Sequence, residues 1–215
     1  NILDALCYHG GLKTNYRNKI PLYSEHFGSI NTKQNYITNI KIFTNIKFFN
    51  EDDPVILLPN TDNKMNSIKT IFHTHPVVDN MFGRIKEGII LDYPSANDIH
   101  HFSVHNLNGL DNSIIVSQEG LYCIRSIDKN IKRKLDFYET EELARLISIN
   151  MKEYVNKYNI KEITFNKYYN KIINDMSMNK NINNYLNKKN IHIEYYPRVK
   201  KDDKYLLRPF YFKVK

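Results

Sequence analysis

The stretch from Ile71 to Phe102 contains two short motifs that restrict how the chain can fold. A His-Thr-His-Pro box occupies residues 73–76, and a Ser-Ala-Asn-Asp motif follows at 95–98. Successive side chains of a strand point to opposite faces, so two histidines spaced two apart project on the same side. The proline then removes a backbone donor and ends regular strand pairing. The box therefore predicts a strand whose end presents two imidazoles to one point.

The second motif predicts the start of a helix. Pro94 and Ser95 are typical of a helix start, which places Asp98 in the first turn. One reading is a plain cap, with Ser95 as N-cap and Asp98 near the positive end of the helix dipole. The other is that Asp98 joins His73 and His75 as a metal ligand. Three nitrogen and oxygen ligands with a fourth position left to water make a catalytic zinc site, whereas a structural site takes a fourth protein ligand.

An acidic residue lies upstream of both motifs. Glu25 is followed by Gly28, which lacks a Cβ and allows the backbone to pass close to another element. An alternative reading of Glu25 is an ordinary exposed carboxylate. Glu51 and Asp52 are competing carboxylates, but their Glu-Asp-Asp-Pro segment is typical of a turn.

Together these positions resemble the signature of the JAMM (MPN-domain) zinc metalloprotease family over about residues 20–126. The matching residues are Glu25-x-x-Gly28-x-Ile30, His73-Thr74-His75-Pro76 and Ser95-x-x-Asp98. The resemblance implies an MPN/cytidine-deaminase-like fold, Zn²⁺ held by His73, His75 and Asp98, and catalytic roles for Glu25 and Ser95.

The spacer between the two motifs departs from the family pattern. Eighteen residues separate Pro76 from Ser95, a longer spacer than the family usually has. The extra residues, Asp79 to Asp92 with Gly83 and Gly88, are interpreted as an inserted loop between ligands. Because such a loop must border the cleft, it is expected to act as a lid or a substrate guide.

Each residue type suggests a chemical role. Zinc lowers the pKa of a bound water to roughly 7, so that hydroxide is available at neutral pH. Glu25, if hydrogen-bonded to that water, accepts its proton and later returns it to the leaving amine. Ser95 has two readings, as a hydrogen-bond donor to the tetrahedral oxyanion or only as the helix cap. Thr74 points away from the two histidines and is expected to pack or hydrogen-bond within the fold.

These features predict a zinc-dependent hydrolase of amide bonds. The resemblance implies peptide or isopeptide bonds in a protein substrate, for example a conjugate of ubiquitin or a ubiquitin-like modifier. A non-catalytic MPN-like scaffold for protein binding is the alternative, although such scaffolds usually lack the ligands. Another His-x-His metallohydrolase, such as an amidohydrolase barrel or a phosphoesterase, recruits further ligands and does not predict Glu25-x-x-Gly28.

Composition limits the class of protein and its surroundings. The length of 215 residues and the hydrophobic content of 41% predict a globular protein rather than a disordered one. Only Cys7 and Cys123 are present, which argues against a disulfide scaffold and for a reducing, intracellular compartment such as the cytoplasm. No non-polar run approaches the roughly 20 residues needed to cross a bilayer. The first residue is Asn1, so we expect an excerpt of a longer polypeptide or a processed product.

The net charge of +8 has two interpretations. One is an acidic or nucleic-acid partner. The other, which we favour, is codon usage, because Asn, Lys, Ile and Tyr are abundant throughout while Gly and Ala are scarce. A genome rich in A and T, as in a large DNA virus or a protist, produces that bias, so a nucleic-acid partner is not favoured.

The expected architecture is an α+β fold, a mixed sheet flanked by helices. Residues 1–19 are a segment of unclear role, 20–160 the JAMM/MPN-like catalytic core, and 161–215 a helical connection and strand pair packed on the same domain. His100, His101 and His105 suggest a second metal or a proton shuttle, but we favour helix-surface or hydrogen-bonded histidines. The other expected elements are strands at 36–49, 67–75, 113–117, 121–127, 191–195 and 205–214, and helices from Asp98 to His105, at 139–158, 165–173 and 176–186.

Overall fold

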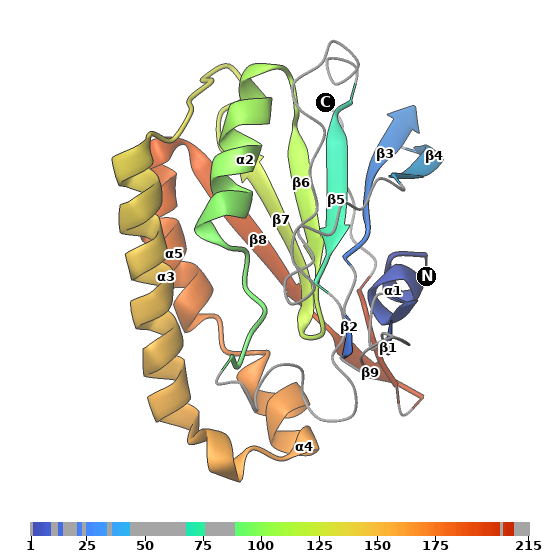
Figure 1. Cartoon of the computed structure of the whole chain (residues 1–215), viewed down its shortest axis with the longest axis vertical. Coiled ribbons are helices and arrows are strands. Elements are labelled where there is room, and N and C mark those ends of the chain that lie inside the picture. The colour runs from blue at the N-terminus through green and yellow to red at the C-terminus, as the bar shows by residue number, and fades with distance from the viewer. Residues whose placement is uncertain are drawn as a thin grey trace.

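A six-stranded mixed sheet forms the centre of the chain (Figure 1). The computed structural model describes residues 2–9, 13–14, 21–22, 25–33, 36–43, 68–75, 89–202 and 204–208. Among these, the sheet has the order β4-β3-β5-β6-β7-β8, in which β5 and β6 run parallel and the other neighbours antiparallel. Its strands are β3 (Phe27–Lys33), β4 (Tyr36–Phe43), β5 (Thr70–Thr74), β6 (Asn112–Val116), β7 (Gly120–Ser126) and β8 (Ile191–Pro197).

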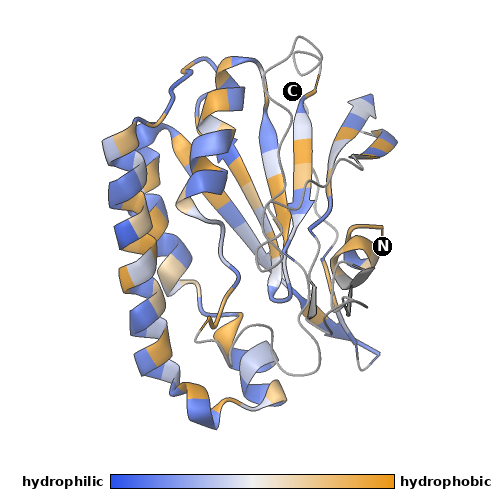
Figure 2. Cartoon of the chain, viewed as in Figure 1, coloured by the Kyte–Doolittle hydropathy of each residue, from blue (hydrophilic) through white to orange (hydrophobic). Residues whose placement is uncertain are grey.

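Helices cover both faces of this sheet. The larger core cluster joins α2 (Ala96–Leu107), α3 (Phe137–Tyr158) and α5 (Ser177–Leu186) to one face. The smaller cluster joins α1 (Ile2–His9) to the other (Figure 1). Neighbouring residues of β5 belong to different clusters: Ile71 lies in the larger one and Phe72 in the smaller one, as the alternation of side chains along a strand requires. Figure 2 shows the central strands as largely hydrophobic and α3 as mixed. The expected α+β class, with a mixed sheet flanked by helices, is confirmed.

The helices α2 and α3 both begin at capping boxes. Ser95 caps α2 with Asp98 as its reciprocal partner, and Asp136 caps α3 with Glu139. Each box satisfies backbone N–H groups that the first turn of a helix leaves unpaired. The non-polar residues of α3 pack into the core: Leu143 and Tyr154 are buried, and Leu146, Ile147, Met151 and Val155 are partly buried.

The C-terminal part contributes a strand to the main sheet and a short hairpin, while most of the strand predicted at 205–214 lies outside the described residues. β8 pairs with β7 in the main sheet, because Ile191 and Ile193 bury their side chains in its larger core cluster. A hairpin is formed by β9 (Val199–Lys201) and β10 (Lys204–Leu206), which pair antiparallel. The remaining short elements are β1 (Lys13–Thr14), β2 (Pro21–Leu22), η3 (Ile160–Glu162), α4 (Phe165–Lys167), the π-helical turn η4 (Tyr168–Ile172) and η5 (Asn187–Lys189).

Several sequence predictions fall outside the described residues. These are Pro76, the competing Glu51 and Asp52, most of the inserted loop from Asp79 to Asp92 with Gly83 and Gly88, and the expected strand beyond residue 208. Within the described part of the chain, no helix is long and non-polar enough to span a membrane.

Gly28 lies in β3 where two neighbours approach the backbone closely. A Cβ added there would lie 2.2 Å from the carbonyl oxygen of Lys41 and 2.6 Å from the ring of Phe72. Real Cβ atoms do not approach other atoms so closely, and Phe72 is fully buried, so its ring cannot move aside freely. The close approach predicted for this glycine is therefore present.

Gly28→Ala is expected to lower the free energy of unfolding by about 1–3 kcal/mol or more, the usual effect of overpacking. Urea denaturation followed by circular dichroism measures this change. Asn31→Ala, at an exposed position of the same strand, is the control and should stay within about 0.5 kcal/mol of the parent. Equal stabilities of the two variants would contradict the packing argument.

Candidate metal centre

The end of β5 delivers two histidines to the same side of the sheet. The ring centroids of His73 and His75 lie 5.2 Å apart. His75 follows the strand, but its backbone N–H still donates to the carbonyl of Val116 (2.8 Å), which continues the β5–β6 pairing. The prediction that the box presents both imidazoles to one point is confirmed.

The first turn of α2 brings Asp98 to the same point. Its Oδ1 lies 3.3 Å from Nε2 of His73, and its Oδ2 lies 3.9 Å from Nε2 of His75. One ligand atom from each of the three residues lies within 4.8 Å of the other two. Within the described residues, this is the one group of three or more His, Cys, Asp or Glu side chains close enough to hold a metal ion.

The chemistry of the donors fits a divalent cation such as zinc. The Nδ1 of His75 lies 3.0 Å from the backbone oxygen of Asp92. Because a carbonyl only accepts, Nδ1 must donate, so in the neutral ring Nε2 is the nitrogen with the lone pair, on the side of Asp98. A backbone partner behind a histidine ligand is the usual arrangement that fixes its orientation at a metal. Two imidazole nitrogens and one carboxylate oxygen are a ligand set found in catalytic zinc sites.

The electrostatics of this group also favour a bound positive charge. Burial alone would lower the pKa of His73, but the Asp98 carboxylate and its hydrogen bond outweigh burial, and Glu25 adds to them, so that pKa is raised. Burial would likewise raise the pKa of Asp98, but His73, His75 and the hydrogen bond from Ser95 lower it well below its ordinary value. Both shifts favour a positive His73 beside a negative Asp98, so a cation that bound here would release a proton.

Ser95 holds the Asp98 carboxylate in place. Its backbone N–H and its hydroxyl both donate to Oδ2 of Asp98 at 2.7 Å, while its Oγ accepts from the Asp98 backbone N–H at 3.1 Å. The helix-cap reading is therefore confirmed, and the same contacts orient the proposed ligand. A hydroxyl that stabilised an oxyanion would have to turn from Asp98 toward the substrate.

Glu25 lies just before β3, opposite the end of β5. Phe27 pairs with His73, and the Thr74 backbone N–H donates to the His26 carbonyl (2.9 Å), so the strands stay side by side beyond β3. Strand alternation places Glu25 on the same face as both histidines. The half-buried Glu25 carboxylate is near enough to His73 to raise its pKa.

Thr74 faces the other way, as predicted. Its side chain is fully buried, and its Oγ1 accepts a hydrogen bond from the backbone N–H of His26 at 2.9 Å. This contact ties β5 to the residue that follows Glu25, and it therefore helps to hold the carboxylate beside the histidines.

The histidines farther along α2 are hydrogen-bonded, which is one of the two readings favoured for them. His105 is not on the surface, because only 4% of it is exposed, and its Nδ1 has no hydrogen-bond partner among the described residues. Its Nε2 lies 2.8 Å from Nε2 of His101, one turn earlier on the same helix face. Burial lowers the pKa of His101 to about 3, so the pair is neutral at pH 7. His100 bonds to Thr140 of α3 instead (3.1 Å).

Two residues near the centre were missed by sequence reasoning. Cys7 of α1 is fully buried, and its Sγ donates to the carbonyl of His75 at 3.1 Å. Burial raises the pKa of this thiol to about 12, so it supports the backbone as a neutral group. Glu119, in the turn between β6 and β7, is fully buried and accepts a hydrogen bond from the Tyr122 hydroxyl at 2.8 Å. No local pattern in the sequence distinguishes either residue from an ordinary helix cysteine or turn glutamate.

Glu119→Gln is expected to stabilise the protein, and more so at high pH. Burial, with a smaller contribution from Asp92, raises the pKa of Glu119 from 4.5 to about 8. Between these values the folded chain binds a proton that the unfolded chain has released, so the free energy of unfolding falls as pH rises through this window. Glutamine can still accept from Tyr122 but carries no charge.

Thermal unfolding of parent and variant, with chelator present, tests this expectation between about pH 5 and pH 9. The difference between the two proteins should widen as pH rises. Glu141→Gln is the control because Glu141 is exposed and has no ion-pair partner among the described residues. A difference that is constant with pH would show that Glu119 titrates normally.

Comparisons with known proteins assign no activity to the chain. No protein-family model matches it, and no solved structure matches it. Among curated proteins it is similar to the uncharacterized protein R413 of Acanthamoeba polyphaga mimivirus, with 31% identity over 220 residues. The match takes in 98% of this chain and 62% of the relative, so the chain spans less than two thirds of the relative's length. The chain thus has a viral relative, in line with one of the two sources, a large DNA virus or a protist, that its composition suggested.

Proposed function

We propose that the chain is a zinc-dependent hydrolase of peptide or isopeptide bonds, of the JAMM (MPN-domain) type. The observation that carries the proposal is the convergence of His73, His75 and Asp98, whose ligand atoms lie within 4.8 Å of one another. The resemblance of these residues, with Glu25 and Ser95, to the JAMM signature supports the reaction class. The mixed sheet, with the histidines at a strand end and the aspartate on the following helix, is compatible with it.

The roles of the residues follow from their positions. When bound, zinc supplies a Lewis acid and lowers the pKa of water to roughly 7. His73, His75 and Asp98 would hold the ion, with Asp92 and Ser95 fixing two of these ligands through hydrogen bonds. Glu25, on the same face, would take a proton from the attacking water and return it to the leaving amine. Ser95, exposed at the helix start, would donate to the developing oxyanion.

A conjugate of ubiquitin or a ubiquitin-like modifier is the substrate class we propose, on the family resemblance alone. We place the protein inside a host cell, because Cys7 and Cys123 are both free and buried, as in proteins of a reducing compartment. The viral relative supports this setting.

The test combines metal analysis with a substrate panel. Purified protein should contain stoichiometric zinc and cleave at least one of a set of ubiquitin chains and ubiquitin-like conjugates. A chelator should abolish the cleavage, and added zinc should restore it. Protein that contains no zinc and takes up none on addition would instead favour a non-catalytic scaffold for protein binding. Chelator-resistant cleavage would contradict the proposed mechanism.

A further inference from the structure

The connection between β7 and α3 exposes an unusual number of large non-polar side chains. We call residues 127–138 the β7–α3 surface. Its exposed non-polar residues are Ile127 (50%), Ile131 (52%), Phe137 (71%) and Tyr138 (82%). The rings of Phe137 and Tyr138 contact each other edge to face, with centroids 5.8 Å apart. Single exposed hydrophobic residues are ordinary on a protein surface, but two exposed aromatic rings in contact with each other are typical of an interaction site.

The same segment carries unpaired positive charge. Lys129, Lys132 and Lys134 are exposed and have no ion-pair partner among the described residues. The carboxylates of both acidic residues of the segment accept hydrogen bonds from nearby backbone N–H groups: Asp128 from Asn130, and Asp136, the N-cap of α3, from Glu139. The surface therefore combines a non-polar centre with free ammonium groups.

Hydrogen bonds hold this segment in a defined shape. The side chain of Asn190 donates to the carbonyls of Asp128 and Ile131, both at 2.8 Å, and accepts from the Asp128 backbone N–H at 2.9 Å. At the other end, the Leu135 backbone N–H donates to Oγ of the buried Ser103 on α2 (3.1 Å). A surface fixed in this way loses little conformational freedom when it binds a partner.

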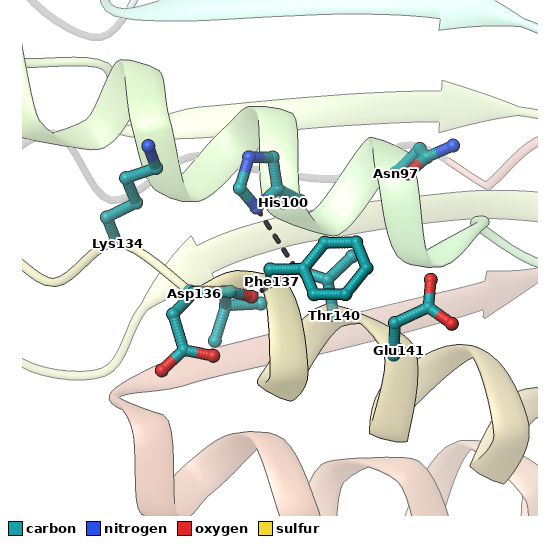
Figure 3. Close-up of a pocket in the computed structure, with 8 residues that line it drawn as sticks. Asn97, His100, Lys134, Asp136, Phe137, Thr140 and Glu141 are labelled. Carbon is teal, nitrogen blue, oxygen red and sulfur yellow. Dashed lines mark hydrogen bonds between the residues drawn. The ribbon is translucent and has the colours of Figure 1, made fainter.

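A concave pocket adjoins the surface between the first turns of α2 and α3. It has a volume of about 550 Å³, and Asn97, His100, Lys134, Phe137 and Glu141 are among its lining residues (Figure 3). Its walls carry a free ammonium, an aromatic ring, an amide and a carboxylate, a mixture suited to a projecting side chain of a protein.

We propose that the β7–α3 surface and this pocket together form a docking site for a protein segment that presents non-polar side chains flanked by carboxylates. The non-polar side chains pack on Phe137 and Tyr138, and the carboxylates pair with Lys129, Lys132 and Lys134. Aromatic anchors ringed by charge are the usual centre of protein interfaces. A phosphate-rich partner, whether nucleic acid or anionic lipid, is the alternative occupant that the test below distinguishes. The proposed docking site is independent of the proposed hydrolase activity.

Binding of defined probes to the full chain tests the proposal. The probes are a fluorescent synthetic peptide with alternating Leu/Phe and Asp/Glu residues, the same peptide with Lys in place of the acids, single-stranded DNA, and phosphatidylserine vesicles. The acidic peptide should bind saturably and at least about tenfold more tightly than the basic one. Amide chemical-shift changes should be concentrated at residues 127–141. Tighter binding of DNA or vesicles, or no saturable peptide binding, would overturn the proposal.

Variants separate the two parts of the site. Phe137→Ala with Tyr138→Ala should weaken acidic-peptide binding at least about tenfold, as expected for aromatic anchors. Lys129→Glu, Lys132→Glu and Lys134→Glu combined should reverse the preference toward the basic peptide. Ile149→Ala and Lys152→Ala, at exposed positions farther along α3, are matched controls and should bind like the parent. Equal losses in the control and test variants would contradict the assigned site. Because all substituted side chains are exposed, folding should be unaffected.

Discussion

Replacing Asp98 with asparagine is expected to abolish zinc binding, and any hydrolysis with it, while the fold survives. Asp98 supplies the negative charge among the three ligands, and it lies within 4 Å of both histidine Nε2 atoms. Loss of a hydrogen-bond partner behind a ligand costs roughly ten- to a hundredfold in affinity, so loss of a ligand charge should cost more than about a hundredfold. Asparagine keeps an oxygen that can accept from the Ser95 backbone N–H, so the start of α2 is retained.

Metal content after dialysis, and the zinc affinity of chelator-treated protein, measure this effect. Circular dichroism of the metal-free proteins checks that α2 and the rest of the fold remain. Asp111→Asn is the matched control, a carboxylate-to-amide change at a partly exposed position just before β6. Zinc bound at full stoichiometry and unchanged affinity in the Asp98 variant would mean that the ion, if present, sits elsewhere.

The parts of the site that follow local rules could be predicted from the sequence. His73 and His75 share a side because side chains of a strand alternate, and Ser95 caps α2 because its hydroxyl and the Asp98 backbone lie three residues apart. The same alternation predicted that Thr74 faces away from the two histidines. Each of these outcomes depends on contacts within a few residues, or on the period of one element.

Features set by long-range packing could not be predicted. Cys7 donates to the carbonyl of His75, 68 positions away, and the buried guanidinium of Arg198 pairs with Asp4, 194 positions away. Neither partner choice leaves a local pattern. The pairing of β8 with β7 is of the same kind, because an amphipathic strand can join any sheet edge that offers a core. The burial of His105 likewise depends on which face of α2 meets the core. Three histidines in one helix do not show by themselves which of them lies on that face.

Replacing Glu25 with glutamine should separate catalysis from metal binding. Glu25 is not one of the three residues whose ligand atoms cluster, so zinc should remain at full stoichiometry. Glutamine keeps the size of the side chain but cannot accept a proton at neutral pH, and a general base contributes about 10²–10⁴-fold to a rate. Turnover of whichever conjugate the parent cleaves should therefore fall by about that factor, with little change in KM. Glu162→Gln, an exposed carboxylate remote in sequence from the motifs, is the matched control.

The outcomes for Glu25→Gln discriminate between different arrangements of the centre. Zinc lost together with activity would make Glu25 a fourth ligand, which is the closed arrangement of a structural site rather than a catalytic one. If the variant retains zinc and turns over substrate as fast as the parent, Glu25 is not the general base. Because Glu25 also raises the pKa of His73, proton NMR of the metal-free variant offers a readout independent of activity. The His73 resonance should titrate at lower pH than in the parent if the carboxylate faces the histidines, and at the same pH if it points away.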